Sequence, residues 1–261
     1  MSAEEVIVER RGPLFSITIN RPRVRNALGS VHLEALRAAV ERASADQEVR
    51  VVSLTGAGSA FCAGGDLSSI FGSRRPLDIR RFLNLYMRPL LRAMLECDKP
   101  IVAVLNGSVA GAGIGIALAA DLIVASERAR FVPAFGRIGA MPDSATLYFL
   151  AQNIGLLRAK EMVLRNRELS AREAEALGLY NTVVAHEQLE EAAQAVIGEI
   201  AAGPTIAHGL AKKALRDALR VPFDVFMDIE SLSMALLITT EDKVEGIKAF
   251  QEKRAPQFTG R

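Results

Sequence analysis

The chain is poor in cysteine, contains no long apolar run and carries no cluster of basic residues, and each absence excludes a class of protein. Its two cysteines, Cys62 and Cys97, are too few for a disulfide framework, so we expect a reducing, cytoplasmic environment. No apolar run approaches the roughly 20 residues that cross a bilayer, and the first residues lack the basic-then-apolar order of a signal peptide. The 32 basic and 30 acidic side chains are scattered, which argues against nucleic acid or membrane partners and favours a small molecule.

Histidine is scarce as well. His32, His186 and His208 lie far apart without the spacing of metal ligands, so we expect no metal site. Cys62 has no histidine or basic residue nearby in the sequence to favour its thiolate, and we interpret it as a small buried residue. Neither metal chemistry nor a cysteine nucleophile is therefore expected.

The order of strand and helix patterns predicts an α/β fold. Two short β-type runs around Gly12 and Pro13 predict an N-terminal hairpin, and a helical pattern begins at Ser30, which we interpret as its N-cap. Strand and helix patterns then alternate along the chain, which is typical of a largely parallel sheet. The predicted strands are residues 49–56, 101–107 and 121–126, and the predicted helices between them are residues 77–95 and 111–120.

The last quarter of the chain reads differently. The final strand pattern is at residues 180–184, and residues 187–255 read as helices that are separated at Gly203-Pro204 and Val221-Pro222. We therefore divide the chain into a core of residues 1–186 and a helical region of residues 187–261.

Two segments rich in glycine and alanine follow predicted strands, at residues 55–67 and 106–122. Small residues there expose backbone N–H groups, and two such donors fixed in advance are suited to hold a developing negative oxygen. For one segment alone, close packing of helix on sheet would be the better interpretation. Two segments at corresponding strand ends favour an oxyanion hole. A dinucleotide fingerprint is rejected, because its spacing is incomplete and no acid ends the following strand.

Five stretches in chain order resemble the crotonase, or enoyl-CoA hydratase/isomerase, superfamily and span nearly the whole sequence. They are AFCAGGDL, NGSVAGAGIGIALAADLIVAS, FVPAFGRIGAMPDSAT, ELSAREAEALGLYNTVV and EGIKAFQEKRAPQF. The resemblance implies a spiral of β-β-α units and a helical C-terminal region used in trimer assembly, as a homotrimer or a dimer of trimers. It also implies an acyl-CoA thioester substrate, with coenzyme A as part of that substrate and no permanently bound cofactor.

The resemblance also implies specific site residues. By position, the two N–H donors for the thioester oxygen fall on Ala63 and Ala112, where Ala112 replaces the glycine usual in the family. The implied coenzyme A contacts are Val24, Arg25, Ala63, Gly65, Asp66 and Leu67, with Phe250 and Lys253 reaching the nucleotide of a neighbouring subunit.

The two glutamates that hydratases of this family use are absent. Gly115 and Phe135 stand at their positions, and neither side chain transfers a proton. Because hydration needs one group to activate water and another to protonate carbon, simple hydration is disfavoured.

Asp143 is the acid that remains in this part of the sequence, and two interpretations of it stay open. As an Asp after Pro142 and ahead of a helical pattern, it suits a helix N-cap. By resemblance, it matches the catalytic aspartate of several branches, which include dienoyl-CoA and epoxyphenylacetyl-CoA isomerases and 4-chlorobenzoyl-CoA dehalogenases. Apolar neighbours would raise its pKa and a helix N-terminus would lower it.

A one-base isomerase fits this inventory best. A dehalogenase would use Asp143 as a nucleophile with help from a histidine, but no histidine lies between His32 and His186, and Phe135 stands where that branch has tryptophan. Dehalogenation is therefore the second choice, beside other acyl-CoA hydrolase or hydratase activity. A non-catalytic relative that binds coenzyme A or RNA ranks lower, since the net charge of +2 does not favour RNA.

Overall fold

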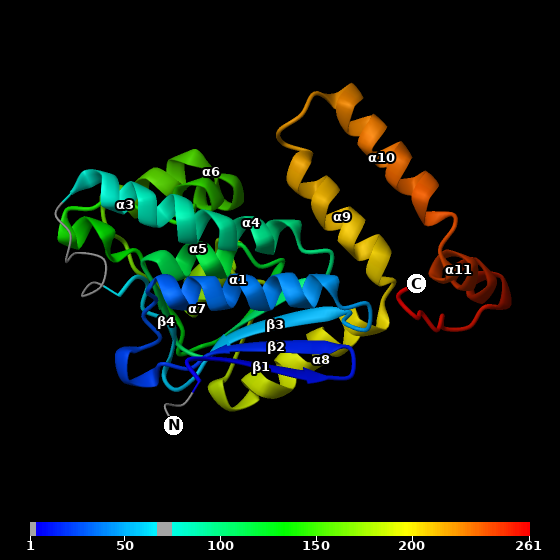
Figure 1. The fold of residues 1–261 in the computed structure, drawn as a ribbon, viewed down its shortest axis with the longest axis horizontal. Coiled ribbons are helices and arrows are strands. Elements are labelled where there is room, and N and C mark those ends of the chain that lie inside the picture. Colours follow the sequence, from blue (N-terminus) through cyan, green and yellow to red (C-terminus); the bar gives the residue numbers. More distant parts are fainter. Residues whose placement is uncertain (1–3, 67–74) are drawn as a thin grey trace.

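The computed structural model describes residues 4–66 and 75–261, and a six-stranded sheet lies at its centre (Figure 1). The strand order is β1-β2-β3-β5-β7-β10, where β1 and β2 are antiparallel and the other neighbours are parallel. These strands are β1 (Val6–Arg11), β2 (Leu14–Ile19), β3 (Val51–Gly56), β5 (Ile101–Leu105), β7 (Leu122–Ser126) and β10 (Thr182–Val184). The predicted hairpin and the largely parallel sheet are confirmed.

A second sheet of short strands has the order β4-β6-β8-β9. Its strands are β4 (Ala60–Cys62), β6 (Ser108–Ala110), β8 (Arg130–Val132) and β9 (Leu169–Ser170). Three times in succession, the chain adds a strand to the large sheet and then one to the small sheet before the next described α-helix. Those helices are α3 (Pro76–Phe82), α5 (Ala112–Leu118) and α6 (Thr146–Leu164). This repeat is the β-β-α spiral that the resemblance implies.

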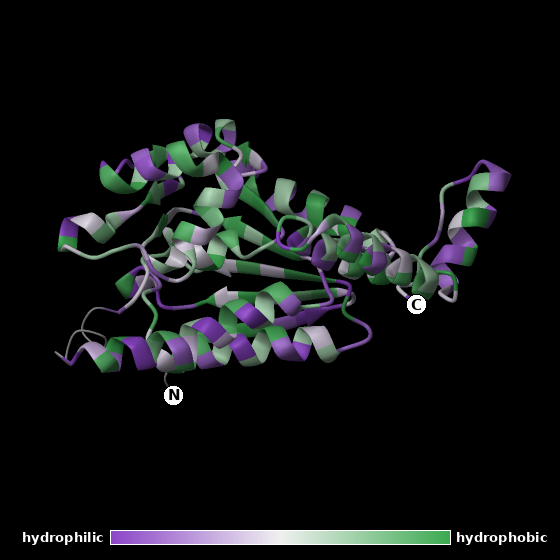
Figure 2. Ribbon diagram, turned by 90° about the horizontal axis from the view of Figure 1, so that it is seen from above, coloured by the Kyte–Doolittle hydropathy of each residue, from purple (hydrophilic) through white to green (hydrophobic). Residues whose placement is uncertain are grey.

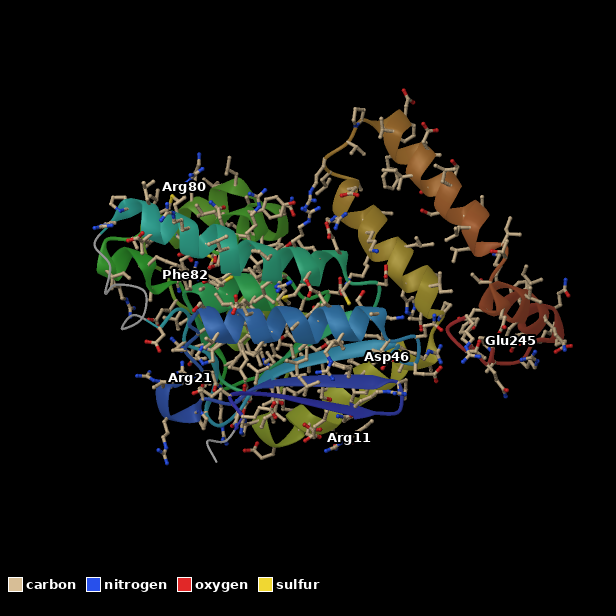
Figure 3. All side chains as sticks on the ribbon, in the orientation of Figure 1. Arg11, Arg21, Asp46, Arg80, Phe82 and Glu245 are labelled. Atoms are coloured by element: carbon tan, nitrogen blue, oxygen red, sulfur yellow. The ribbon has the colours of Figure 1, made fainter. Side chains whose placement is uncertain are left out.

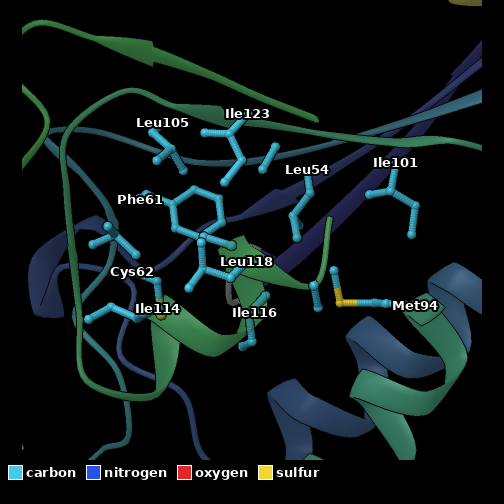
Figure 4. Close-up of a cluster of buried hydrophobic side chains, with 14 of the residues drawn as sticks. Leu54, Phe61, Cys62, Met94, Ile101, Leu105, Ile114, Ile116, Leu118 and Ile123 are labelled. Atoms are coloured by element: carbon cyan, nitrogen blue, oxygen red, sulfur yellow. The ribbon is translucent and has the colours of Figure 1, made fainter. Parts of the chain in front are cut away.

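The main core lies between the two sheets and the helices that cover them. Phe61, Leu105 and Ile114 are fully buried in it, and Figure 4 shows them packed together. On the other face of the large sheet, α8 (Leu189–Ala202) packs against valines of β3, β5 and β7. Both faces of the parallel strands are thus covered, which explains their continuous apolar sequences.

Two predicted helices differ in detail from the structure. Helix α1 (Ser30–Ala45) begins at Ser30, but its N-cap is Gly29, so the cap prediction was wrong by one residue. The ring of His32 takes the role that Glu or Gln has at the third residue of a helix in a capping box, because its Nδ1 accepts a hydrogen bond of 2.9 Å from the N–H of the N-cap residue Gly29. The helix predicted at residues 77–95 is continuous through α3 and α4 (Arg88–Glu96), but a π-helical segment, η2 (Leu83–Met87), joins them.

The C-terminal helices confirm the predicted all-helical region and its two breaks. They are α8, α9 (Thr205–Asp217), α10 (Phe223–Leu237) and α11 (Glu241–Glu252). Helices α10 and α11 extend away from the body as an arm (Figures 1 and 2). No residue of α10 is buried, and Phe250 of α11 is 86% exposed. The arm therefore presents apolar side chains that the single chain leaves uncovered.

Arg50 ties the base of this arm to the body. Its guanidinium donates hydrogen bonds to the carbonyl oxygens of Gly203 and Phe258 and to Oγ1 of Thr205, the last at 3.0 Å. A single side chain beside β3 thus holds the start of α9 and the chain's last residues together.

The structure also describes the cysteines, the possible metal ligands and the lengths of the helices. Both cysteines are free and buried, and burial raises the pKa of Cys62 to about 12, so the prediction of a small buried residue is confirmed. Within residues 4–66 and 75–261, no three His, Cys, Asp or Glu side chains form a group that could hold a metal ion. No helix of the described chain is long and apolar enough to cross a bilayer.

Candidate active site

A cavity of about 190 Å³, here called the central cavity, opens where the ends of β4 and β6 meet the segment before α6. Helix α3 and the π-helical segment η2 line one side of it, and half-buried Phe82 is among the lining residues. Figure 3 labels Phe82, the last residue of α3. The residues on which its chemistry depends are Ala63, Gly65, Ala112, Phe135, Asp143 and Ser144. Most other lining side chains are apolar, so a charge inside this cavity is poorly solvated.

The two glycine-rich segments touch at one wall of the cavity. A Cβ added to Gly64 would lie 2.9 Å from the carbonyl oxygen of Ala110 and 3.0 Å from the amide nitrogen of Ala112. Gly64 also has a φ of 96°, which side chains rarely adopt. Glycine at this position therefore permits the backbone of both segments to come together.

In the first segment, the free donor is Gly65 and not Ala63. The Ala63 N–H donates to the carbonyl of Arg25 at 2.9 Å, and the Asp66 N–H donates to that of Leu28 at 2.8 Å. Among the described residues, no acceptor is found for the Gly65 N–H. The prediction of Ala63 as an open donor is thus wrong, because the backbone at Arg25 has already paired with it.

In the second segment, the prediction of Ala112 agrees with its geometry. Ala112 is the first residue of α5, and a first-turn amide has no acceptor within its own helix. The preceding N–H, of Gly111, donates to Val132 at 3.3 Å. Within the described chain no acceptor is found for the Ala112 N–H, so Gly65 and Ala112 line the cavity as two unpaired donors on touching segments.

Asp143 lines the same cavity, and its carboxylate is not a helix cap. Helix α6 begins at Thr146 with Ala145 at the N-cap, and no side chain caps it. The hydroxyl of Ser144 donates to Oδ1 of Asp143 at 2.8 Å. Burial raises the pKa of Asp143, and this hydrogen bond only partly offsets it. Desolvation is therefore the stronger influence on this pKa, and it outweighs the hydrogen bonds to the carboxyl group.

An unusual backbone presents Asp143 to the cavity. Ser144 and Ala145 both adopt left-handed conformations, with φ of 53° and 60°, which are uncommon for residues with a side chain. The Asp143 carbonyl accepts a hydrogen bond of 2.9 Å from Thr146 N–H across this turn. Two strained residues thus separate the aspartate from the regular helix behind it.

The same turn fills the space of the first missing glutamate. A Cβ on Gly115 would overlap the carbonyl oxygen of Ser144 and would lie 2.8 Å from its carbonyl carbon. No side chain fits at position 115 without a shift of the backbone that carries Asp143. At the second position, Phe135 is buried in the wall. Asp143 is consequently the single ionisable side chain among the described residues that line the cavity.

Some of the implied coenzyme A contacts lie near the first glycine-rich segment, and the others lie in the C-terminal arm. Val24 and Arg25 lie at the end of a short 3-10 helix, η1 (Pro22–Val24), whose backbone is joined to the first glycine-rich segment through the Arg25 carbonyl. Asp66 is within 3.4 Å of the Arg21 guanidinium. Leu67 lies outside the described residues. Phe250 is exposed on α11 and Lys253 is exposed directly after it, in the arm and far from the rest of the set (Figure 1).

Sequence reasoning missed two features of this site. Ser144 was not named, although a hydroxyl next to the candidate acid is a signal for a hydrogen bond to it. Gly65 was named as a coenzyme A contact and not as a donor. The repeated glycines indicated free amides, but only the pairing with Arg25 decides which amide remains free.

Comparisons with known proteins agree with this fold and site. The family model described as enoyl-CoA hydratase/isomerase matches residues 9–261. A probable enoyl-CoA hydratase of Rhodobacter capsulatus is 38% identical over the full length of both chains. A 1,2-epoxyphenylacetyl-CoA isomerase of Escherichia coli is 33% identical and covers 95% of each chain. A crystal structure of an enoyl-CoA hydratase subunit from Geobacillus kaustophilus superposes with a TM-score of 0.92, at 34% identity and 99% coverage of both chains.

The chain therefore belongs to the enoyl-CoA hydratase/isomerase family, within the crotonase superfamily, and is an acyl-CoA enzyme of that family. Its relatives carry both hydratase and isomerase names, so membership alone leaves the reaction open.

Proposed function

We propose that this protein is an isomerase of acyl-CoA thioesters in which Asp143 is the only acid–base group. The reaction would move a double bond or open a strained ring next to the thioester. The observation that carries the proposal is that Asp143 is the single ionisable side chain lining the central cavity in the described chain.

The two unpaired amides would stabilise the negative charge that this proton transfer creates. With the thioester oxygen between the N–H groups of Gly65 and Ala112, removal of a proton from the adjacent carbon places negative charge on that oxygen. Donors already fixed at that position stabilise the enolate without reorganising. The pair is thus suited to the intermediate more than to the neutral substrate.

Asp143 then acts twice in one turnover. Its carboxylate takes a proton from one carbon and becomes a carboxylic acid, and the same proton returns to another carbon as the double bond moves. The substrate and product contain the same atoms, and Asp143 ends in its starting state. Burial supports this role, because a raised pKa brings the acid closer to a carbon acid in proton affinity.

Hydration is less well supported by the same geometry. It needs a second group to handle water, and position 115 has no room for a side chain while position 135 holds a buried phenylalanine. Dehalogenation is also less well supported, because no histidine is among the described residues that line the cavity. An aryl ester trapped on Asp143 with 4-chlorobenzoyl-CoA would favour that alternative.

The proposal extends to coenzyme A and to assembly. The coenzyme would be contacted near the cavity mouth by Val24, Arg25, Ala63, Gly65 and Asp66. Phe250 and Lys253 would serve the site of a neighbouring subunit in a trimer or a dimer of trimers, which agrees with their exposure on the arm. Residues 187–261 would then form the oligomerisation region beside a core of residues 1–186.

The substitution Asp143→Asn tests the proposed reaction. It removes the proton acceptor while keeping the size of the side chain, so we expect kcat to fall at least about 100-fold while acyl-CoA binding is retained. Turnover of enoyl-CoA and phenylacetyl-CoA panels, with products identified by mass spectrometry, measures this. The matched control is Glu34→Gln, which removes an exposed carboxylate from α1 and should leave turnover unchanged.

Stability of the same variant separates catalysis from a structural role. The folded-state pKa of Asp143 is raised, so its charged form opposes folding, and this cost is absent below the ordinary aspartate pKa and grows as pH rises through the raised one. Asp143→Asn should therefore raise the Tm at neutral pH and leave it unchanged in acid. A lower Tm with intact turnover would identify Asp143 as a structural residue and refute the proposal.

A further inference from the structure

A second cavity, here called the arginine cavity, lies directly behind the central one. It has a volume of about 520 Å³ and is bounded by η2, α4, the start of α6 and α9. Figure 1 shows α9 beside the end of α4. The two cavities share Leu83, Met87 and Ser144 as lining residues, so they adjoin at a wall to which these three residues belong.

The shared wall is made of adaptable elements. Leu83 and Met87 are the two ends of the π-helical segment η2, and such segments are frequent at functional sites. Met87 is buried and carries an unbranched, flexible side chain that fills irregular spaces and changes rotamer readily. The shared wall thus contains a side chain that can adapt its shape to a bound group.

The arginine cavity carries an excess of positive charge. Arg88, Arg92, Arg216 and Arg220 line it, and Glu96 is the acid among its described lining residues. Three of these arginines have acidic partners: Arg92 pairs with Glu96 at 2.8 Å, and Arg216 and Arg220 share Asp217 at 3.1 and 3.6 Å.

Arg88 differs from the other three arginines. Within residues 4–66 and 75–261, no acid is found within ion-pair distance of its guanidinium. It is exposed at the first turn of α4, directly after Met87 in the chain. One cationic side chain thus stands unpaired next to the shared wall.

The direction of a bound acyl group follows from the order of the lining residues. The amides of Gly65 and Ala112 are at one wall of the central cavity, and Asp143 and Ser144 are also in its lining. Ser144 and Ala145 then line the arginine cavity. An acyl chain that extends from the amides past Asp143 therefore points its distal end toward the arginines.

We propose that the acyl substrate carries an anionic group, a carboxylate, at its distal end, and that Arg88 binds it in the arginine cavity. This inference rests on the proposed function, because it takes the thioester to lie at the two amides. An uncharged alkyl end would gain nothing from an unpaired guanidinium, whereas a carboxylate forms charge-assisted hydrogen bonds with it.

The test compares two enoyl-CoA thioesters of equal chain length, one ending in a carboxylate and one in a methyl group. Wild-type enzyme should show the lower KM for the carboxylate-ended substrate. Arg88→Gln should raise that KM about tenfold, as expected for one charge-assisted hydrogen bond, and leave the KM of the methyl-ended substrate unchanged. The matched control is Arg158→Gln on exposed α6, which lines neither cavity and should change neither KM.

Equal KM values for the two substrates in wild-type enzyme would overturn the inference, as would an equal effect of Arg88→Gln on both. Its failure is distinguishable from failure of the proposed function. If neither thioester is isomerised, the proposed function fails, and calorimetric binding of the saturated pair to wild type and Arg88→Gln then decides the inference by itself. Selective loss of carboxylate-ended binding supports it, and no selectivity refutes it.

Discussion

The two halves of the candidate site are built by different means. The amide pair is made of backbone from Gly65 and Ala112, at the ends of strands in the small sheet, where close contact of two glycine-rich segments fixes it. The acid is one side chain, Asp143, presented by two left-handed residues. Backbone donors tolerate changes of side chain, whereas the acid depends on local geometry. The first half thus suits a whole family of thioester reactions, and the second selects one of them.

The largest effect is expected from a substitution that removes one donor of the amide pair and leaves Asp143 in place. Ala112→Pro removes one donor, and proline is tolerated at the first residue of a helix, so α5 should persist. We expect kcat to fall by about 10² to 10³, the usual cost of losing one oxyanion donor. Ala112→Gly keeps the N–H and is the matched control, with turnover close to wild type. If Ala112→Pro folds and turns over substrate normally, the amide pair is not the oxyanion hole.

The second effect tests whether the acid half can be exchanged for that of a hydratase. Gly115→Glu restores a glutamate at its family position, but the carbonyl of Ser144 occupies the space of its Cβ. We expect no gain of crotonyl-CoA hydration and a loss of isomerisation, with a stability loss of about 1–3 kcal/mol from overpacking. Gly198→Ala in α8 is the matched control, because it too replaces a helical glycine without a positive φ, but its Cβ would meet no atom within 4 Å. Brisk hydration by Gly115→Glu would contradict the one-acid proposal.

The smallest effect is expected from a substitution that changes the pKa of Asp143 and leaves its carboxylate in place. The hydroxyl of Ser144 lowers the pKa of Asp143, so Ser144→Ala should raise that pKa further. If Asp143 is the base that we propose, activity falls as pH drops through its pKa, and this fall should begin at a higher pH in the variant. At high pH, kcat should remain within a few-fold of wild type. Profiles of kcat/KM against pH measure the shift, and an unchanged profile in Ser144→Ala would show that this hydroxyl does not act on Asp143.

The large sheet and the C-terminal helices could be predicted from the sequence, whereas the small sheet could not. Strand periodicity and glycine breaks predicted the large sheet and the C-terminal helices, because burial on both faces leaves a clear apolar pattern. The small sheet was harder, since its strands, such as Ala60–Cys62, are only two or three residues long. Motifs spanning the chain supplied the spiral instead.

Some features of the site could be predicted from residue types, and others depend on contacts between distant parts of the chain. Asp143 stood out because the surrounding sequence is apolar, and the missing glutamates at Gly115 and Phe135 followed from motif positions. Which amide is free, at position 63 or 65, depends on a pairing with Arg25 from another part of the chain. Likewise, the obstruction at Gly115 arises from the backbone of Ser144, which no local pattern encodes.

The bonds of Arg50 have a consequence for the order of assembly during synthesis. Arg50 emerges from the ribosome early, yet its partner Phe258 lies 208 residues later. The bond to Phe258 therefore cannot form until residue 258 has been made, and a growing chain carries α9, α10 and α11 while Arg50 has only Gly203 and Thr205 as partners at the base of the arm.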